Sequence, residues 1–221
     1  LRGMGAILIL IGHTVAFWGL QYAPTGAVCV DLFFLLSGFV IAFAYEPRLA
    51  AGMGVREFMT HRMVRLYPLY LLSIVMSLAW GAVAIMGDAN ASARIHEGTD
   101  GLFPQLFMLP VPGSEKLYPL NGPAWTLFSE LLVNLVFVLI WRWLSTRVLV
   151  VIVAVAAVFL TLVVFADGGI DGGASWPSFW AGPARAFFGF FAGVLTFRMI
   201  GAPARPGGRR SLWALPFLFI V

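Results

Sequence analysis

The sequence has little charge and almost no cysteine. Only 11% of its 221 residues are charged, against about 25% in an ordinary soluble domain, and 61% are hydrophobic. The mean hydropathy of +0.92 argues against a water-soluble domain. Cys29 is the single cysteine, which excludes an intramolecular disulfide and a cysteine metal site, and we expect no metal. We interpret Cys29 as a small, buried, apolar residue.

The apolar residues lie in long blocks. At about 1.5 Å per residue, each complete block is long enough for a helix to cross a hydrocarbon core of about 30 Å. The sequence therefore predicts an all-α fold, a polytopic transmembrane helix bundle with six complete spans and a truncated seventh. The blocks are 4–20, 27–45, 67–87, 125–141, 148–166, 179–199 and one that opens at Leu212. Because the chain begins with Leu1 and the last block stops at Val221, we expect a C-terminally truncated single domain, 1–221.

The basic residues are concentrated on one side of these predicted spans. Eleven of the fourteen basic residues fall at the start of the chain and in the segments 46–66, 142–147 and 198–211. The other side, made of 88–124 and 167–178, holds mostly acids. The positive-inside rule then predicts that the basic side and the N-terminus are cytoplasmic. These basic segments are short and tethered to the bilayer, so we expect no nucleic-acid partner.

The segment 88–124 is the one long loop on the predicted outer side. Within it Leu102 to Leu109 is apolar, but it is too short and too rich in proline to span. We expect a re-entrant or interfacial piece there.

Polar side chains inside the spans are the candidates for function, because charge is costly in a bilayer. Arg2 and His13 are eleven positions apart, which at about 100° per residue brings them to one helix face and separates them by about 16.5 Å along the axis. A neutral imidazole can take a proton from a hydroxyl near physiological pH. An alternative is that Arg2 anchors the helix and His13 forms a hydrogen bond within the bundle.

Two further groups of polar residues flank the third and fourth spans. Arg62 and Arg65 lie at i and i+3, so on a helix they could clamp phosphates as a pair, or else serve as charge anchors. Glu130 is predicted just below the outer surface, where it could orient His13, contact an acceptor or pair with Arg185. The other polar candidates, for substrate contact or helix packing, are Asp31, Ser37 and Asn134.

Five short motifs together resemble the acyltransferase 3 family of membrane acyltransferases. The resemblance runs through nearly the whole chain, in the order of the family's own motifs. The motifs are Arg2 through His13, Asp31 through Phe39 with Ser37 and Gly38, Arg62 through Tyr70, Trp125 through Glu130, and Arg185 with Gly189 and Gly193.

The resemblance implies a bundle of about ten helices and an enzyme that uses cytoplasmic acyl-CoA, acetyl-CoA above all, as its co-substrate. It implies an acceptor hydroxyl on a glycan or glycolipid, and a location in the bacterial cytoplasmic (inner) membrane. His13 would be the catalytic base and Arg2 its companion on the donor side, with Glu130 as a further catalytic candidate. Arg62 and Arg65, with Tyr67 beside them, would hold coenzyme A.

A transporter or flippase for a glycan or small anion is the rival interpretation. The same charges inside the membrane would then line a translocation path. Neither an inverted repeat nor a pair of broken helices is evident in the sequence, which favours the enzyme.

Overall fold

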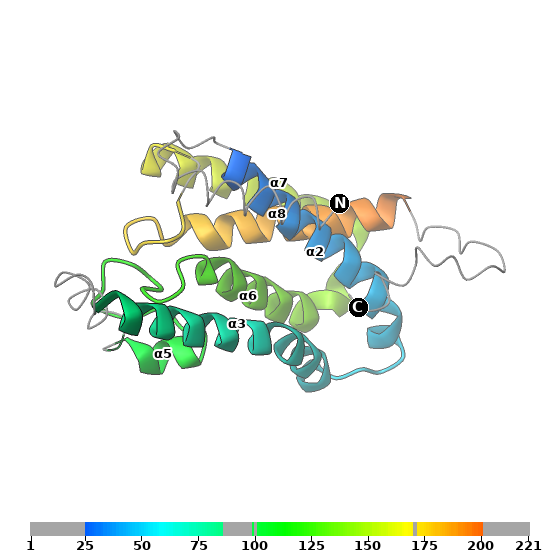
Figure 1. Ribbon diagram of the computed structural model, residues 1–221. Helices are drawn as coiled ribbons and strands as arrows, with labels where there is room; N and C mark the ends of the chain where they lie inside the picture. Colours follow the sequence, from blue (N-terminus) through cyan, green and yellow to red (C-terminus); the bar gives the residue numbers. More distant parts are fainter. Residues whose placement is uncertain (1–24, 86–98, 100, 170–171, 201–221) are drawn as a thin grey trace. The chain divides into compact units, whose positions relative to one another are not determined.

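The computed structural model describes residues 25–85, 99, 101–169 and 172–200, and within them the regular elements are all helical (Figure 1). One isolated antiparallel bridge joins Lys116 to Ser175. The elements are α2 (Thr25–Ala50), α3 (Val55–Ile85), α5 (Leu102–Leu106), α6 (Ala124–Ile140), the 3-10 helix η2 (Trp141–Trp143), α7 (Thr146–Asp167) and α8 (Ala181–Ile200).

Five of these helices are long and apolar enough to cross a membrane. They are α2, α3, α6, α7 and α8, and they confirm the predicted all-α class. The predicted spans at 4–20 and from Leu212 lie outside the described residues. The predicted start of α3 was wrong, because the helix begins at Val55 and the prediction began it at 67. The residues in between are polar yet compatible with a helix, and hydropathy alone does not detect such a stretch.

Large apolar side chains remain exposed along the spanning helices. On α7, Val151, Val155, Val158 and Leu162 are each more than 60% exposed. A continuous apolar surface of this kind would be unfavourable in water and is expected where a helix faces lipid. Cys29 is buried, in agreement with its interpretation as a small apolar residue.

The contacts divide the chain into two compact units. The first comprises 1–54, 143–155 and 188–221, and the second comprises 55–142 and 156–187. The prediction of one transmembrane domain across 1–221 stays a prediction.

In the first unit, α2 and α8 approach each other through glycines. A Cβ atom at Gly38 would lie 1.9 Å from the carbonyl oxygen of Phe190, and one at Gly193 would lie 2.0 Å from that of Leu35. Real side chains cannot occupy such positions, so the two backbones touch where the glycines are. Gly38 therefore permits close packing of the two helices.

We expect Gly38→Ala to destabilise the protein by about 1–3 kcal/mol, although alanine is the better helix former, because its methyl group would collide with the Phe190 backbone. Thermal unfolding in detergent measures the change. Gly54→Ala is the matched control, since no atom of a described residue, apart from its chain neighbours, lies within 4 Å of the Cβ position there. Equal stability of the two variants would contradict the proposed backbone contact.

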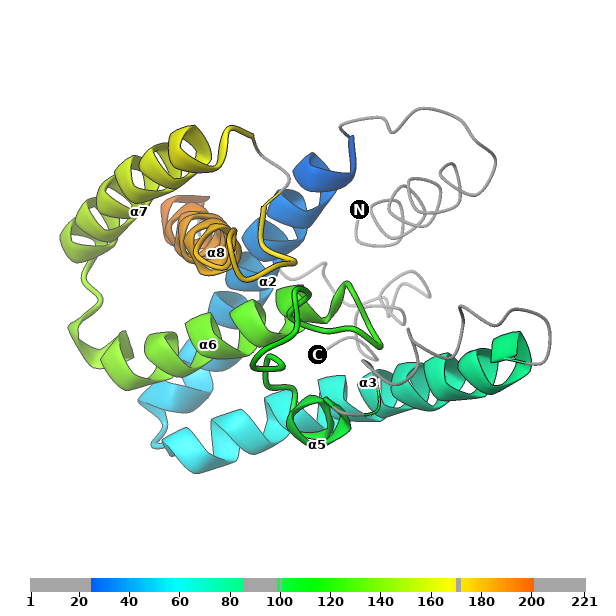
Figure 2. The same ribbon diagram turned by 90° about the vertical axis from the view of Figure 1, so that its left-hand side faces the viewer.

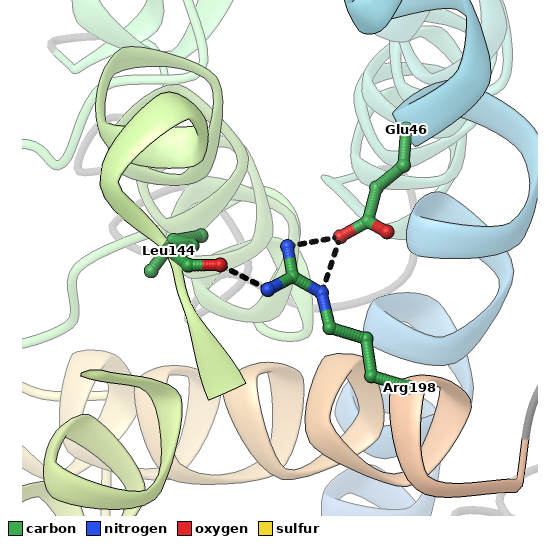
Figure 3. Close-up of polar contacts among 3 residues, drawn as sticks. All are labelled: Glu46, Leu144 and Arg198. Carbon is green, nitrogen blue, oxygen red and sulfur yellow. Dashed lines mark hydrogen bonds and ion pairs between the residues drawn. The ribbon is translucent and has the colours of Figure 1, made fainter. Parts of the chain in front are cut away.

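Arg198 ties three segments of the first unit together (Figure 3). Its Nε and Nη2 donate to Glu46 Oε1 on α2, at 2.9 and 2.5 Å. Its Nη1 donates to the carbonyl oxygen of Leu144, which lies between η2 and α7. The sequence predicts these three segments on one membrane side, and this shared contact agrees with that prediction.

Arg198→Lys should not preserve this arrangement, because an ammonium lacks the planar fork that reaches two acceptors at once. We expect a loss of about 1 kcal/mol, since both ionic side chains are partly solvated. Unfolding temperatures compared with Arg142→Lys, at an exposed arginine of η2, measure it. A loss no larger than that of the control would show that the fork contributes nothing.

In the second unit, α3 and α6 run antiparallel. Phe58, near the start of α3, packs on Phe137, near the end of α6, with ring centroids 6.3 Å apart. Farther along α3, Ser73 accepts a 2.6 Å hydrogen bond from Asn121, which precedes α6. The short α5 lies against α3 in both views (Figures 1 and 2). The start of α6 is therefore level with the middle of α3.

The two loops predicted on the outer side meet in this unit. The amide of Leu117 donates to the carbonyl oxygen of Ala174 at 3.1 Å. The indole of Trp176 donates to the carbonyl oxygen of Val111 at 2.9 Å. The pairing of 88–124 with 167–178 agrees with the predicted alternation of loops.

Candidate functional site

An ion pair between Arg62 and Glu130 lies inside the second unit. Arg62 Nη2 is 2.5 Å from Glu130 Oε1, and the side chains are 3% and 20% exposed. Arg62 comes from α3 and Glu130 from α6, so the pair joins two spanning helices. Removing charges from water is costly, and mutual attraction in a poorly polarisable interior offsets that cost when the geometry is good.

Asn134 extends this polar group by one turn of α6. It is fully buried, and its Nδ2 donates to the carbonyl oxygen of Glu130 at 2.8 Å. Its Oδ1 and the Nε of Arg62 are buried with no hydrogen-bond partner among the described residues. One acceptor and one donor are thus left for a further polar group, and buried polar atoms normally have a partner.

The predicted levels of Arg62 and Glu130 were wrong. Arg62 was assigned to an inner loop, 46–66, and Glu130 to a position just below the outer surface, yet the two side chains touch. The loop between α2 and α3 is confined to 51–54, and Arg62 lies on the third turn of α3. Glu130 reaches the level of Arg62 because α6 starts level with the middle of α3.

Arg65 and Tyr67 follow Arg62 on α3. Arg65 is half-buried, three residues after Arg62 and on the same side of the helix. The Tyr67 hydroxyl donates to the carbonyl oxygen of Leu106 in α5 at 2.8 Å, so this side chain ties α3 to the predicted outer segment. That these three residues bind coenzyme A stays a prediction.

Arg185 forms a second buried group at the start of α8. It is 4% exposed, its guanidinium lies 5.6 Å from the centre of the Trp125 ring, and its Nη1 is 3.4 Å from the carbonyl oxygen of Gly172. Gly173 and Gly182 leave room for this ring, because a Cβ at either position would lie 3.0 Å from it. Arg185 therefore stacks on the indole that opens α6.

The remaining candidates are placed as follows. Asp31 is half-buried and Ser37 is buried, both on α2 of the first unit. Arg2 and His13 lie outside the described residues. The Arg198–Glu46 pair was missed, because Arg198 was counted only as a loop charge and Glu46 was not considered. The pair could have been predicted, because Glu46 and Arg198 carry opposite charges and lie near the inner ends of two predicted spans.

The fold and its buried charges define a polytopic helical membrane protein with an ion pair between spanning helices. The chain belongs to the acyltransferase 3 family, whose model, described as an acyltransferase domain, matches residues 1–221. The chain is therefore an acyltransferase, and the family expected from the motifs is confirmed.

Two curated relatives are similar to the chain, and one of them is named an acyltransferase. "Protein 2 in picA locus" of Rhizobium radiobacter is 35% identical over 174 residues, which cover 72% of this chain and 89% of that protein. "Acyltransferase MdmB" of Streptomyces mycarofaciens is 30% identical over 125 residues, which cover 56% of this chain and 30% of that protein. No solved structure matches the chain.

Removing one partner of the Arg62–Glu130 pair should be worse than removing both. Glu130→Ala leaves a buried guanidinium without its counter-charge, for which we expect a loss of about 3–5 kcal/mol. Replacing both residues with methionine removes the charges together and should restore much of the stability. The fraction of protein that remains monodisperse after heating ranks the wild-type protein, Glu130→Ala and the double variant by stability.

Glu57→Gln is the control, because Glu57 is an exposed acid on α3, the helix that carries Arg62. If the double variant were as unstable as Glu130→Ala, the uncompensated charge would not be the cause of the loss.

Proposed function

We propose that this acyltransferase moves an acyl group, acetyl above all, from cytoplasmic acyl-CoA to a hydroxyl of a glycan or glycolipid. Family membership and the relative named an acyltransferase support the reaction class. They favour catalysis over the rival role of a transporter or flippase. We further propose the bacterial cytoplasmic membrane as its location, with the N-terminus inside, and both relatives come from bacteria.

The observation that carries the donor side of this proposal is the guanidinium of Arg62. Glu130 engages its Nη2, and its buried Nε–H has no acceptor among the residues that the structure describes. A phosphate oxygen is an acceptor of the required kind, and a guanidinium has enough donors to keep its carboxylate as well. Arg65, three residues on, adds a second cation on that side of α3. These residues fit the phosphates of coenzyme A.

In the reaction that we propose, the acceptor hydroxyl attacks the thioester carbonyl carbon. The new C–O bond forms, the C–S bond breaks, and coenzyme A leaves as its thiol. His13 takes the hydroxyl proton and returns it to the departing sulfur, so protons balance without another reactant. Arg2 assists on the donor side. Glu130 acts through Arg62, which it holds between the helices.

The acceptor side of the proposal rests on Asn134. Asn134 leaves a buried carbonyl oxygen, Oδ1, that could accept a hydrogen bond from a sugar hydroxyl. A glycan has many hydroxyl groups that both donate and accept, which suits such a site.

Membranes that carry the protein, incubated with radiolabelled acetyl-CoA and isolated surface glycan, test the reaction. We expect His13→Ala, at equal protein level, to lower label transfer by about 10²–10⁴-fold, since a general base is lost. Arg65→Ala should raise the KM for acetyl-CoA about tenfold, in line with the loss of one charged hydrogen bond.

Arg56→Ala is the matched control for Arg65→Ala, because Arg56 is an exposed arginine of the same helix. Unchanged transfer by His13→Ala would remove this residue from the mechanism. An equal rise of KM in Arg56→Ala and Arg65→Ala would remove the specific phosphate contact.

A further inference from the structure

The segment 101–121 of the predicted outer loop has the composition of a buried element. Residues 101–114 carry no charge, whereas Asp100 precedes them and Glu115 and Lys116 follow. The segment contains one short helix, α5, and is otherwise irregular. Irregular backbone is ordinarily found in water, because its polar groups need partners.

Hydrogen bonds attach this segment to the middle of α3. Tyr70 donates through its hydroxyl to the carbonyl oxygen of Gln105 at 2.5 Å, in addition to the bond from Tyr67 to Leu106. Ser77 donates to the carbonyl oxygen of Leu120 at 2.6 Å. Tyr70 is the central residue of α3, which at about 1.5 Å per residue puts α5 about 20 Å below the outer end of that helix.

The outer half of α3 carries large, exposed, apolar side chains along its length. Val75, Trp80 and Val83 are 60%, 73% and 63% exposed, and each is large and apolar. Hydrocarbon that covers α3 as far as Val83 also surrounds the level of Tyr70. Because α6 begins only at that level, the segment 101–121 occupies the space beside the outer half of α3.

The segment meets the requirement that a membrane sets for irregular backbone. Gln105 is fully buried, donates through Nε2 to the Gly101 carbonyl oxygen and accepts from the Leu120 amide, each at 3.0 Å. The Tyr118 hydroxyl donates to the Met108 carbonyl oxygen at 2.8 Å. Met108 has a φ of 58°, a left-handed conformation in which the chain reverses after α5. Side chains thus supply the partners that water supplies elsewhere.

The opposite side of α5 is aromatic and exposed. Phe103 and Phe107 are 75% and 60% exposed, with ring centroids 5.3 Å apart, and Leu109 is 49% exposed. In water such a cluster would be unfavourable by the hydrophobic effect. At the depth of Tyr70 it matches the hydrocarbon around it.

We infer that 101–121 is a re-entrant loop, which enters the membrane from the predicted outer side, reverses at Met108 and returns to the start of α6. Phe103 of α5 and Phe107, which directly follows this helix, contact the acyl chains of bilayer lipids. This interaction does not depend on the proposed acyl transfer. Beside the outer half of α3, the segment 101–121 thus occupies space within the membrane that lipid would otherwise fill.

Site-directed spin labelling of the full chain in lipid bilayers tests the loop. On a Cys29→Ala background, single cysteines replace Phe103 and Phe107. Met76→Cys on the exposed apolar side of α3 is the lipid reference, and Ala51→Cys, at an exposed residue in the turn between α2 and α3, is the aqueous reference. We expect labels at 103 and 107 to collide with oxygen and to avoid a water-soluble nickel complex, as the label at 76 does.

Nickel accessibility at 103 and 107 equal to that at 51 would overturn the inference, because α5 would then be in water. A second measurement keeps the native sequence. Lipids with a diazirine at the end of the acyl chain are photolysed with the unmodified protein, and adducts are mapped by mass spectrometry. Adducts on Phe103 or Phe107 support the loop, whereas adducts on α3 between Val75 and Trp80 with none on 101–109 contradict it.

Discussion

The buried ion pair between Arg62 and Glu130 is the constraint on which the arrangement of the second unit depends. A charge in this environment needs its partner, and the partner is on another helix, so the axial register of α3 and α6 is determined to within the reach of two side chains. Phe58 on Phe137 and Asn121 on Ser73 repeat the same antiparallel register. A one-turn slip would break all three contacts together.

This register explains why the outer segment is folded as it is. With α6 starting level with the middle of α3, the outer half of α3 needs another neighbour, and 101–121 provides it. Polar side chains of α3, chiefly Tyr67, Tyr70 and Ser77, satisfy the carbonyl groups of this neighbour. A spanning helix that is apolar overall thus retains a few hydroxyl groups at the positions where an irregular segment must be held.

The arginines of this chain have roles beyond marking the inner side of the membrane. Arg198 joins Glu46 to the carbonyl oxygen of Leu144, Arg62 joins α3 to α6, and Arg185 stacks on Trp125. Each is on a helix, although the first two were counted as loop residues. Their planar, multiply donating side chains can bind one partner and retain donors for another. This is the property that the proposed donor site requires of Arg62.

The sequence alone determined the class of the protein and its family. Long apolar blocks predict spanning helices whatever the tertiary structure, because a bilayer demands about 20 apolar residues per helix. Motifs such as Arg62 through Tyr70 and Trp125 through Glu130 were sufficient to predict the family. Only the tertiary structure decided that Arg62 pairs with Glu130, that α3 starts at Val55 and that Tyr67 holds α5. Hydropathy measures how apolar a stretch is, whereas the depth of a residue depends on which helices pack together and in which register.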